Sequence, residues 1–219
     1  MTCKAAESLS EQIAHHLAGR IIRGELKERE RIQEQKITHS LDVSRGPVRE
    51  ALLILQRRHL IAIVPNRGAQ VTELTVDNVQ GLYALMIELY VMLACAVAER
   101  WRTLAELAPF RALQEKLAVS AARRDIHAFV EQSFAVIRAG FPFATNPYLQ
   151  DTLENLLPAI SRTYHLVLKR RESEMTQCLD FFTHLLEAVM ARDLPRIRTA
   201  LDAYGRHNCQ LVVAALAER

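Results

Sequence analysis

Apolar residues recur at helical spacing through the first third of the chain. Ile13, Leu17 and Ile21 follow one another at intervals of four, which predicts an amphipathic helix over residues 10–22. The same pattern predicts two further helices, over residues 32–41 and from Ser44 onward.

The third of these helices has two distinct faces. Its apolar residues follow the spacing i, i+3, i+4 and i+7 and form one stripe: Val48, Ala51, Leu52 and Leu55. Arg45 and Arg49 lie one turn apart on another face, with Gln56 farther along it. A guanidinium group fits both phosphates and the O6/N7 edge of guanine, and the major groove of DNA admits one helix. The pattern favours a DNA-reading helix, and its alternative is a solvated arginine face.

Two short β-prone runs follow, Ile61–Val64 and Ala69–Thr72, separated by Pro65-Asn66-Arg67-Gly68. Pro, Asn and Gly have the backbone preferences of a turn, which predicts a hairpin. Three helices and a hairpin with a basic tip predict a winged helix-turn-helix over residues 1–75.

Beyond Thr75 the chain has helical patterns and no convincing strand pattern. Asn146 and Asp193 are expected to cap two helices, and Pro158 to bend one. Residues 82–97 are apolar on nearly every side, which predicts burial against the rest of a bundle and against a second subunit. The predicted helices cover residues 76–101, 104–123, 126–139, 147–169, 173–191 and 195–217.

The expected fold class is therefore mainly α. An N-terminal winged helix-turn-helix, with three helices and a β-hairpin wing, is followed over residues 76–219 by an all-α bundle of six to seven helices. Composition agrees with long helices, because half of the residues are apolar and only 7 Gly and 7 Pro occur.

Charge distinguishes the two predicted domains. Residues 1–75 contain 12 Lys and Arg against 9 Asp and Glu, whereas the remainder contains 16 of each kind. All of the net charge of +3 therefore belongs to the first domain, where a phosphate-binding surface would need it.

Cysteine spacing and hydropathy limit which other classes of protein the chain could belong to. The four cysteines have no CxxC spacing, so neither a zinc knuckle nor a disulfide scaffold is indicated. No basic and then apolar leader opens the chain, and Glu88 interrupts the apolar stretch at 82–97, which is too short to span a bilayer. We expect a cytoplasmic protein without a membrane partner.

The run Leu41-Asp42-Val43-Ser44-Arg45-Gly46-Pro47-Val48-Arg49-Glu50-Ala51-Leu52 resembles the signature that opens the recognition helix of GntR-family regulators. Asn66-Arg67-Gly68-Ala69-Gln70-Val71 is similar to the wing of that family. The resemblance implies binding to double-stranded operator DNA. The contacts that it implies fall on Gln35, Ser44, Arg45, Arg49, Arg67 and Gly68.

The chain departs from the family at three places. The family usually has Pro-Gly before Arg31, where this chain has Arg29-Glu30, and usually has Gly where His59 stands. Gln35 occupies a position at which some members have Arg, which bears on sequence preference or on one phosphate contact.

The second domain resembles the FadR C-terminal (FCD) domain over essentially all of residues 75–219. The best segments are His184-Leu185-Leu186-Glu187-Ala188-Val189-Met190-Ala191-Arg192-Asp193 and Ala200-Leu201-Asp202-Ala203-Tyr204-Gly205-Arg206-His207. The resemblance implies a homodimer that senses a small-molecule effector, with an organic acid as the expected class.

In the FCD family two such histidines bind a divalent metal together with an Asp and a His of an earlier helix. Here Glu131 replaces the Asp and Ala135 replaces the His, so Glu131, His184 and His207 are the remaining candidate ligands for Zn, Ni or Mn. Both histidines share helix faces with apolar residues and are expected to point inward. Water or an effector carboxylate could complete the shell. Alternatively, the pocket no longer binds a metal and holds its effector through these side chains.

The function that these patterns favour is a dimeric DNA-binding regulator, a repressor rather than an activator, which a small metabolite releases from its operator. One alternative is a metal-dependent helical-bundle enzyme with an accessory nucleic-acid-binding domain. The chain shows no nucleophile–base pair, and the ligand set is incomplete, which weighs against an enzyme. A structural nucleic-acid protein without an effector is a third possibility, which the length and apolar character of the second domain disfavour.

Overall fold

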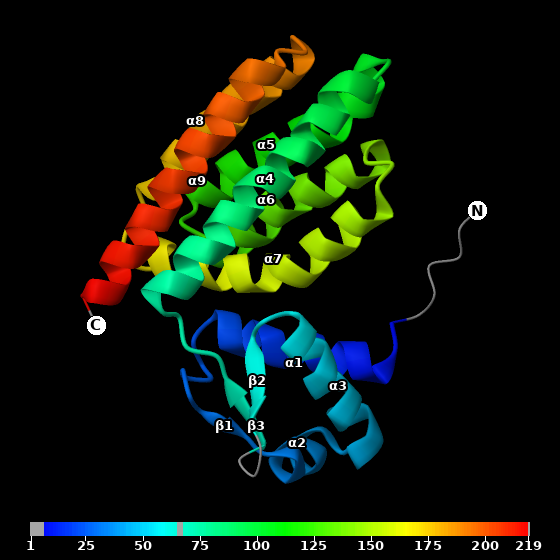
Figure 1. Cartoon of the computed structure of the whole chain (residues 1–219), viewed down its shortest axis with the longest axis vertical. Helices are drawn as coiled ribbons and strands as arrows, with labels where there is room; N and C mark the ends of the chain where they lie inside the picture. The colour runs from blue at the N-terminus through cyan, green and yellow to red at the C-terminus, as the bar shows by residue number, and fades with distance from the viewer. Residues whose placement is uncertain (1–6, 65–67, 219) are drawn as a thin grey trace. The chain divides into compact units, whose positions relative to one another are not determined.

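The computed structural model describes residues 7–64 and 68–218. The chain divides into two compact units, Met1–Leu74 and Thr75–Arg219 (Figure 1). Each unit buries an apolar core of its own.

The first unit combines helices with a small antiparallel sheet. The sheet has the strand order β1-β3-β2, and β2 pairs with β3 from Ile61 opposite Val71 to Val64 opposite Gly68. These elements form the winged helix-turn-helix that the sequence predicts. In chain order they are α1 (Leu9–Ile22), β1 (Arg31–Ile32), α2 (Glu34–Leu41), α3 (Arg45–Arg57), β2 (Ile61–Val64) and β3 (Gly68–Val71).

The core of this unit forms where α1 packs against α3. Leu17 and Ile21 of α1 are buried with Val48 and Leu55 of α3, as their helical spacing predicts. The side chain of Ser8 caps α1 by accepting a hydrogen bond from the backbone N–H of Glu11. This packing fixes the direction of α3 and leaves its arginine-bearing face free of the core.

One strand differs from the sequence prediction. Residues 31 and 32 form β1, with Arg31 opposite Gln70 and Ile32 opposite Ala69, so the helix expected from residue 32 begins only at Glu34. The buried side chain of Ile32 belongs to the core through a strand and not through a helix face. A strand of two residues has no periodicity of its own, and its pairing partner lies far away in sequence.

Arg29 and His59 in loops of the first unit have a left-handed backbone. The φ angle is 60° at Arg29 and 56° at His59. Both residues fall in the loops where the chain departs from the glycine-containing pattern of the GntR family. A side chain in this region costs about 1–2 kcal/mol that glycine avoids.

Replacing His59 with Gly should therefore raise the free energy of unfolding by about 0.5–1 kcal/mol, since relief of the left-handed strain exceeds the added entropy of the unfolded chain. Chemical denaturation of the purified protein measures the change. The matched control is His39→Gly inside α2, which should lower stability by about 1 kcal/mol because glycine is a poor helix former. Equal destabilisation by both changes would show that the strain at residue 59 is negligible.

The second unit is built from helices throughout the residues that the structure describes. Thr75, Asn146 and Asp193 cap their helices through side-chain hydrogen bonds to backbone N–H groups. The α-helices are α4 (Val76–Arg100), α5 (Ala108–Ala122), α6 (Ile126–Gly140), α7 (Pro147–Leu168), α8 (Glu174–Met190) and α9 (Leu194–Ala217), and two 3-10 turns occur at η1 (Leu104–Leu107) and η2 (Phe141–Phe143).

The segment predicted as one helix over residues 104–123 is in fact the 3-10 turn η1 followed by α5. Pro109 stands in the first turn of α5, where its missing N–H costs no intrahelical hydrogen bond and its fixed φ favours the start of a helix. In contrast, α7 continues through Pro158.

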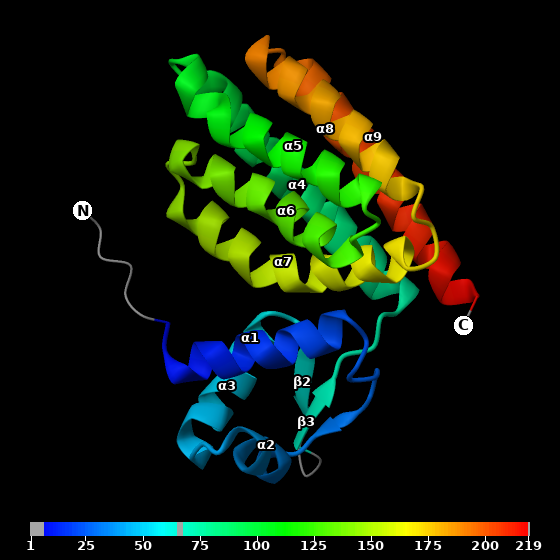
Figure 2. The same ribbon diagram turned by 180° about the vertical axis from the view of Figure 1, so that it is seen from behind.

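Helix α4 is the centre of this bundle. It packs most extensively against α9 and also contacts α6, α7 and α8. Helices α4 and α9 lie side by side on the face seen in Figure 1, while α5 and α6 face the viewer in Figure 2. The two central helices approach closely at Gly205, where an added Cβ would lie 2.4 Å from Cγ1 of Ile87.

Candidate nucleic-acid interface and an apolar cavity

Helix α3 presents a polar surface at its N-terminal end. Ser44 is the N-cap residue, and its side chain makes no capping hydrogen bond. Ser44, Arg45 and Arg49 are exposed, whereas Val48 and Leu52 on the opposite face are buried. The hydroxyl and two guanidinium groups are therefore available to a ligand that approaches this end of the helix.

An ion pair links α3 to α2. Nε of Arg49 donates to Oε2 of Glu34 at 3.0 Å, and both side chains are accessible to solvent. An exposed pair of this kind contributes little to stability, up to about 1 kcal/mol, but it orients the guanidinium group. Gln35, the next residue of α2, is also exposed.

Replacing Glu34 with Gln should raise the affinity for non-specific DNA severalfold at low salt and reduce the preference for the operator. The change removes a negative charge beside Arg45 and Arg49, which are predicted to contact DNA, and frees Arg49 to rotate. Fluorescence anisotropy at two salt concentrations, with operator and random duplexes, measures both effects. Glu25→Gln makes the same charge change in the loop after α1 and should leave the preference unaltered. An identical effect of both changes would exclude a specific role for the Glu34 pair.

The predicted wing contacts are only partly within the described residues. Gly68 begins β3, is exposed, and has a φ angle of 74°, a conformation that favours glycine. Arg67 lies outside the described residues. The DNA-contacting roles of Gln35, Ser44, Arg45, Arg49, Arg67 and Gly68 stay predictions.

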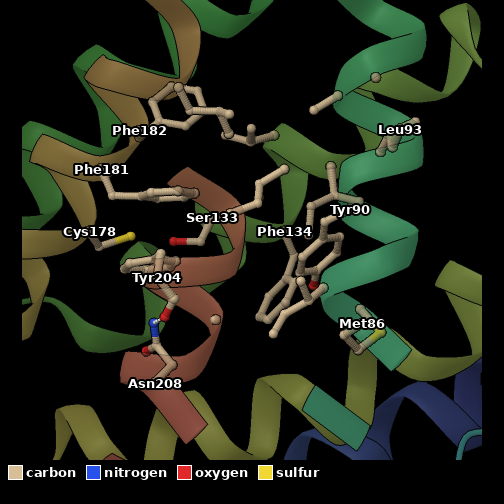
Figure 3. A pocket seen from close by; sticks show the side chains of 18 of the residues that line it. Met86, Tyr90, Leu93, Ser133, Phe134, Cys178, Phe181, Phe182, Tyr204 and Asn208 are labelled. Atoms are coloured by element: carbon tan, nitrogen blue, oxygen red, sulfur yellow. Dashed lines mark hydrogen bonds between the residues drawn. The ribbon is translucent and has the colours of Figure 1, made fainter. Parts of the chain in front are cut away.

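The second unit contains a partly open cavity of about 140 Å³, which residues of α4, α5, α6, α7, α8 and α9 line. Figure 3 shows Met86, Tyr90 and Leu93 of α4 on one side and Cys178, Phe181 and Phe182 of α8 on the other. Its walls are predominantly aliphatic and aromatic, and none of its lining residues is Asp, Glu, Lys, Arg or His. Such a chamber suits an apolar molecule.

A cluster of weakly polar groups interrupts the apolar lining. Ser133, Cys178, Tyr204 and Asn208 lie together in Figure 3. The ring of Tyr204 stacks on that of Phe181 with their centroids 3.9 Å apart, and its hydroxyl accepts a hydrogen bond of 3.3 Å from Tyr164. Burial raises the pKa of the Cys178 thiol to about 11, against the lowering effect of the hydroxyls of Tyr204 and Ser133. The thiol is therefore protonated at neutral pH and is no nucleophile.

Two tyrosines of α4 line the cavity, and their hydroxyl groups differ in hydrogen bonding. The hydroxyl of Tyr83 is hydrogen-bonded to Oγ1 of Thr163 at 2.9 Å. The hydroxyl oxygen of Tyr90 is also buried, but it has no hydrogen-bond partner within the described part of the chain. Burial raises the pKa of both tyrosines far above the usual value, so both hydroxyls are neutral.

The structure places Glu131, His184 and His207 outside the cavity, and their role as one metal or effector site stays a prediction. Glu131 is 69% exposed and lies 3.7 Å from the imidazole of His127. His184 is exposed, so it does not point inward. His207 is half-exposed, and its Nε2 lies 2.9 Å from a carboxylate oxygen of Glu174. None of the three predicted residues lines the cavity.

These residues do not fit the metal centre that the FCD resemblance implies. Residues 7–64 and 68–218 contain no group of three or more His, Cys, Asp or Glu that could hold a metal ion. Ala135 supplies no ligand at the position of the family's histidine. The position of each residue around its helix explains this placement. On α6, burial of Val130 and Phe134 turns Glu131 toward solvent, and on α8, burial of Phe182 and Leu186 turns His184 toward solvent.

Sequence reasoning missed the residues that do line the cavity. Ser133, Leu185 and Asn208 stand within two residues of the predicted positions but on different faces of their helices. The available signal was a set of aromatic residues on α4, α6 and α8, namely Tyr83, Tyr90, Phe134, Phe181 and Phe182. Because aromatic residues at helical spacing also fill ordinary cores, that signal does not separate a cavity from a packed interior.

Comparison with known families identifies both units. The sequence matches the description "Bacterial regulatory proteins, gntR family" over residues 9–71 and the description "FCD domain" over residues 82–207. The chain belongs to the FCD-containing GntR family. It is a transcriptional regulator with an effector-binding domain, and the enzyme alternative is not supported.

Individual relatives agree with this assignment. The HTH-type transcriptional regulator McbR of Escherichia coli (strain K12) is 24% identical over 206 residues, which cover 94% of this chain and 93% of McbR. The HTH-type transcriptional regulator YdhC of Bacillus subtilis (strain 168) is 35% identical over 78 residues, which cover 36% of this chain and only 35% of YdhC.

Solved structures show the same fold. The structure of E. coli McbR/YncC has a TM-score of 0.80 at 23% identity and covers 94% of this chain and 97% of that chain. A transcriptional regulator GntR from Rhodococcus sp. RHA1 has a TM-score of 0.74 at 20% identity, with coverages of 94% and 97%. The GntR regulators therefore share both units with this chain, in the same order.

Proposed function

We propose that the protein is a cytoplasmic, homodimeric repressor that leaves its operator when a small molecule occupies the cavity of the second unit. The observation that carries the proposal is the separation of two features. An exposed arginine-bearing helix end lies in one unit, and a partly open apolar cavity lies in the other.

The DNA-binding role rests on α3. Arg45 and Arg49 lie one turn apart and are exposed, as a helix that reads the major groove requires. Arg45 is the better candidate for a bidentate contact with guanine, because within the described residues it makes no ion pair that must first be broken. Ser44, Gln35 and the wing residues Arg67 and Gly68 would contact phosphates and fix the position of the helix.

Dimerisation is supported by an unpartnered face of α4. This is a helix long and apolar enough to cross a membrane, yet only 33% of its most apolar 18-residue stretch is buried. Leu85 and Met92, seven residues apart on one face, are each 48% exposed. Because exposed apolar surface of this extent marks an interface, we assign the face to a second copy of the chain.

The same helix connects the cavity with the proposed interface. Tyr83, Met86 and Tyr90 line the cavity, and Leu85 and Met92 occupy another face of α4. A ligand that fits better when α4 shifts against α9 would therefore favour one arrangement of the dimer. The free energy of DNA binding then becomes less favourable by the difference between the ligand-binding free energies of the two arrangements.

Selection of an operator from random duplexes, followed by footprinting, tests this function. A symmetric dimer of winged helices should protect an inverted repeat whose half-sites are related by two-fold symmetry. Selection of a single unrepeated site, bound by a monomer, would contradict the proposal.

A further inference from the structure

The cavity lacks any group that could neutralise a charged ligand. Among the residues that the structure describes, all of the lining side chains are uncharged, and their N, O and S–H groups are hydroxyls, a thiol and one amide. A carboxylate buried there would lose its hydration without gaining an ionic partner, which is strongly unfavourable. This composition disagrees with the organic acid expected from the family resemblance.

An acidic group beside the cavity bears on the same question. A second, water-sized void of about 10 Å³ adjoins the cavity, since Tyr164, Cys178, Tyr204 and Asn208 line both spaces. The nearly buried carboxylate of Glu174 lines this void. Glu174 is in turn paired with His207 at 2.9 Å, so this wall offers an anionic ligand no free positive charge.

The size of the cavity limits the ligand as well. A volume of about 140 Å³ is comparable with that of cavities known to hold one benzene ring. Stacked and tilted aromatic rings form much of the boundary, including the Phe181–Tyr204 pair and the Phe134–Tyr164 pair. A compact, ring-containing molecule makes good contacts with such walls.

One polar atom in the cavity is unsatisfied. The buried hydroxyl of Tyr90 has no hydrogen-bond partner within the described residues, whereas Tyr83, seven residues earlier on the same helix, donates to or accepts from Thr163. A buried hydroxyl without a partner costs free energy, and it can both donate and accept. A ligand with one hydroxyl, carbonyl or N–H group would satisfy it.

We propose that the cavity binds an uncharged, ring-sized apolar molecule whose single polar group forms a hydrogen bond with the hydroxyl of Tyr90. The inference rests on the proposed effector role of the cavity and names the chemical class of the effector. It excludes both a free carboxylic acid and a metal-bound ligand from this site.

Calorimetric titration with three matched probes tests the class. The probes are p-cresol, its isostere p-xylene without the hydroxyl, and 4-methylbenzoate with a negative charge. We expect p-cresol to bind at least on the order of a hundredfold more tightly than 4-methylbenzoate, because only the carboxylate must be stripped of strongly bound water. Tighter binding of 4-methylbenzoate would overturn the proposal.

Two variants of α4 test the role of Tyr90. Tyr90→Phe removes the unpaired hydroxyl and should lower the ratio of p-cresol to p-xylene affinity about tenfold, the value of one hydrogen bond. Tyr83→Phe removes a hydroxyl that is already paired and should leave this ratio unchanged. An unchanged ratio in Tyr90→Phe, or an equal drop in both variants, would contradict the assignment of Tyr90.

Thermal unfolding of the free variants gives an independent result. Tyr90→Phe should unfold at the same temperature as the wild type or a higher one, since no hydrogen bond is lost, and Tyr83→Phe should unfold at a lower temperature. Operator binding is measured on the same samples. If operator binding is intact and 4-methylbenzoate alone displaces the DNA, the regulator function stands and only the proposed ligand class fails.

Discussion

The double variant Arg45→Ala/Arg49→Ala should lose about 2–6 kcal/mol of operator-binding free energy while remaining folded and dimeric. Each exposed guanidinium group at the start of α3 is expected to contribute about 1–3 kcal/mol through contacts with guanine or phosphate. Neither side chain belongs to the buried face of the helix, so the core of the first unit is untouched. Gel-shift titration at fixed salt measures the loss, and circular dichroism monitors the fold.

Single substitutions separate base reading from phosphate binding. Arg45→Lys keeps the charge but loses the two-pronged geometry, so it should weaken operator binding more than non-specific binding. Arg57→Ala removes an equal charge from the last turn of the same helix and serves as the control, with a small effect expected. Operator affinity that is unchanged in the double variant would mean that α3 does not read the DNA.

The first unit was predictable because its signals are local. Leu17, Val48 and Leu55 belong to apolar patterns with helical spacing, which do not depend on how the elements pack. The turn residues at 65–68 predict the hairpin. The strand β1 was not predictable, since Ile32 is defined as a strand residue only by its pairing with Ala69, across the whole helix-turn-helix. Helix α3 could therefore be predicted from the sequence, whereas β1 was found only in the structure.

The cavity was not predictable from the sequence for a different reason. Whether Tyr90 and Phe181 pack against one another or leave a space depends on distances between helices, which no pattern along one helix encodes. The placement of the candidate metal ligands also depends on the packing of the helices. His207 occupies the sequence position of a ligand, but the next residue of α9, Asn208, lines the cavity, whereas the half-exposed His207 pairs with the nearly buried Glu174.

The double variant Leu85→Glu/Met92→Glu should convert the protein to a monomer at micromolar concentration. Both side chains lie on the half-exposed face of α4, so the monomer tolerates the change, whereas the proposed dimer would bury four unpaired carboxylates at its two-fold interface. The cost per buried charge is several kcal/mol, which exceeds what an ordinary interface can absorb. Light scattering should show the mass of one chain.

Loss of the dimer should in turn weaken operator binding at least about a hundredfold, because each winged unit then binds its half-site without the effective concentration that its partner supplies. Leu104→Glu is the matched control: Leu104 is 55% exposed in η1, outside α4, and its replacement should leave both the mass and the operator affinity unchanged. A dimeric Leu85→Glu/Met92→Glu protein with a native unfolding temperature would place the interface elsewhere. If the wild type and both variants are all monomers, the proposal that a symmetric dimer binds an inverted repeat is contradicted. The roles of Arg45 and Arg49 are tested separately, by the operator titration of their own variants.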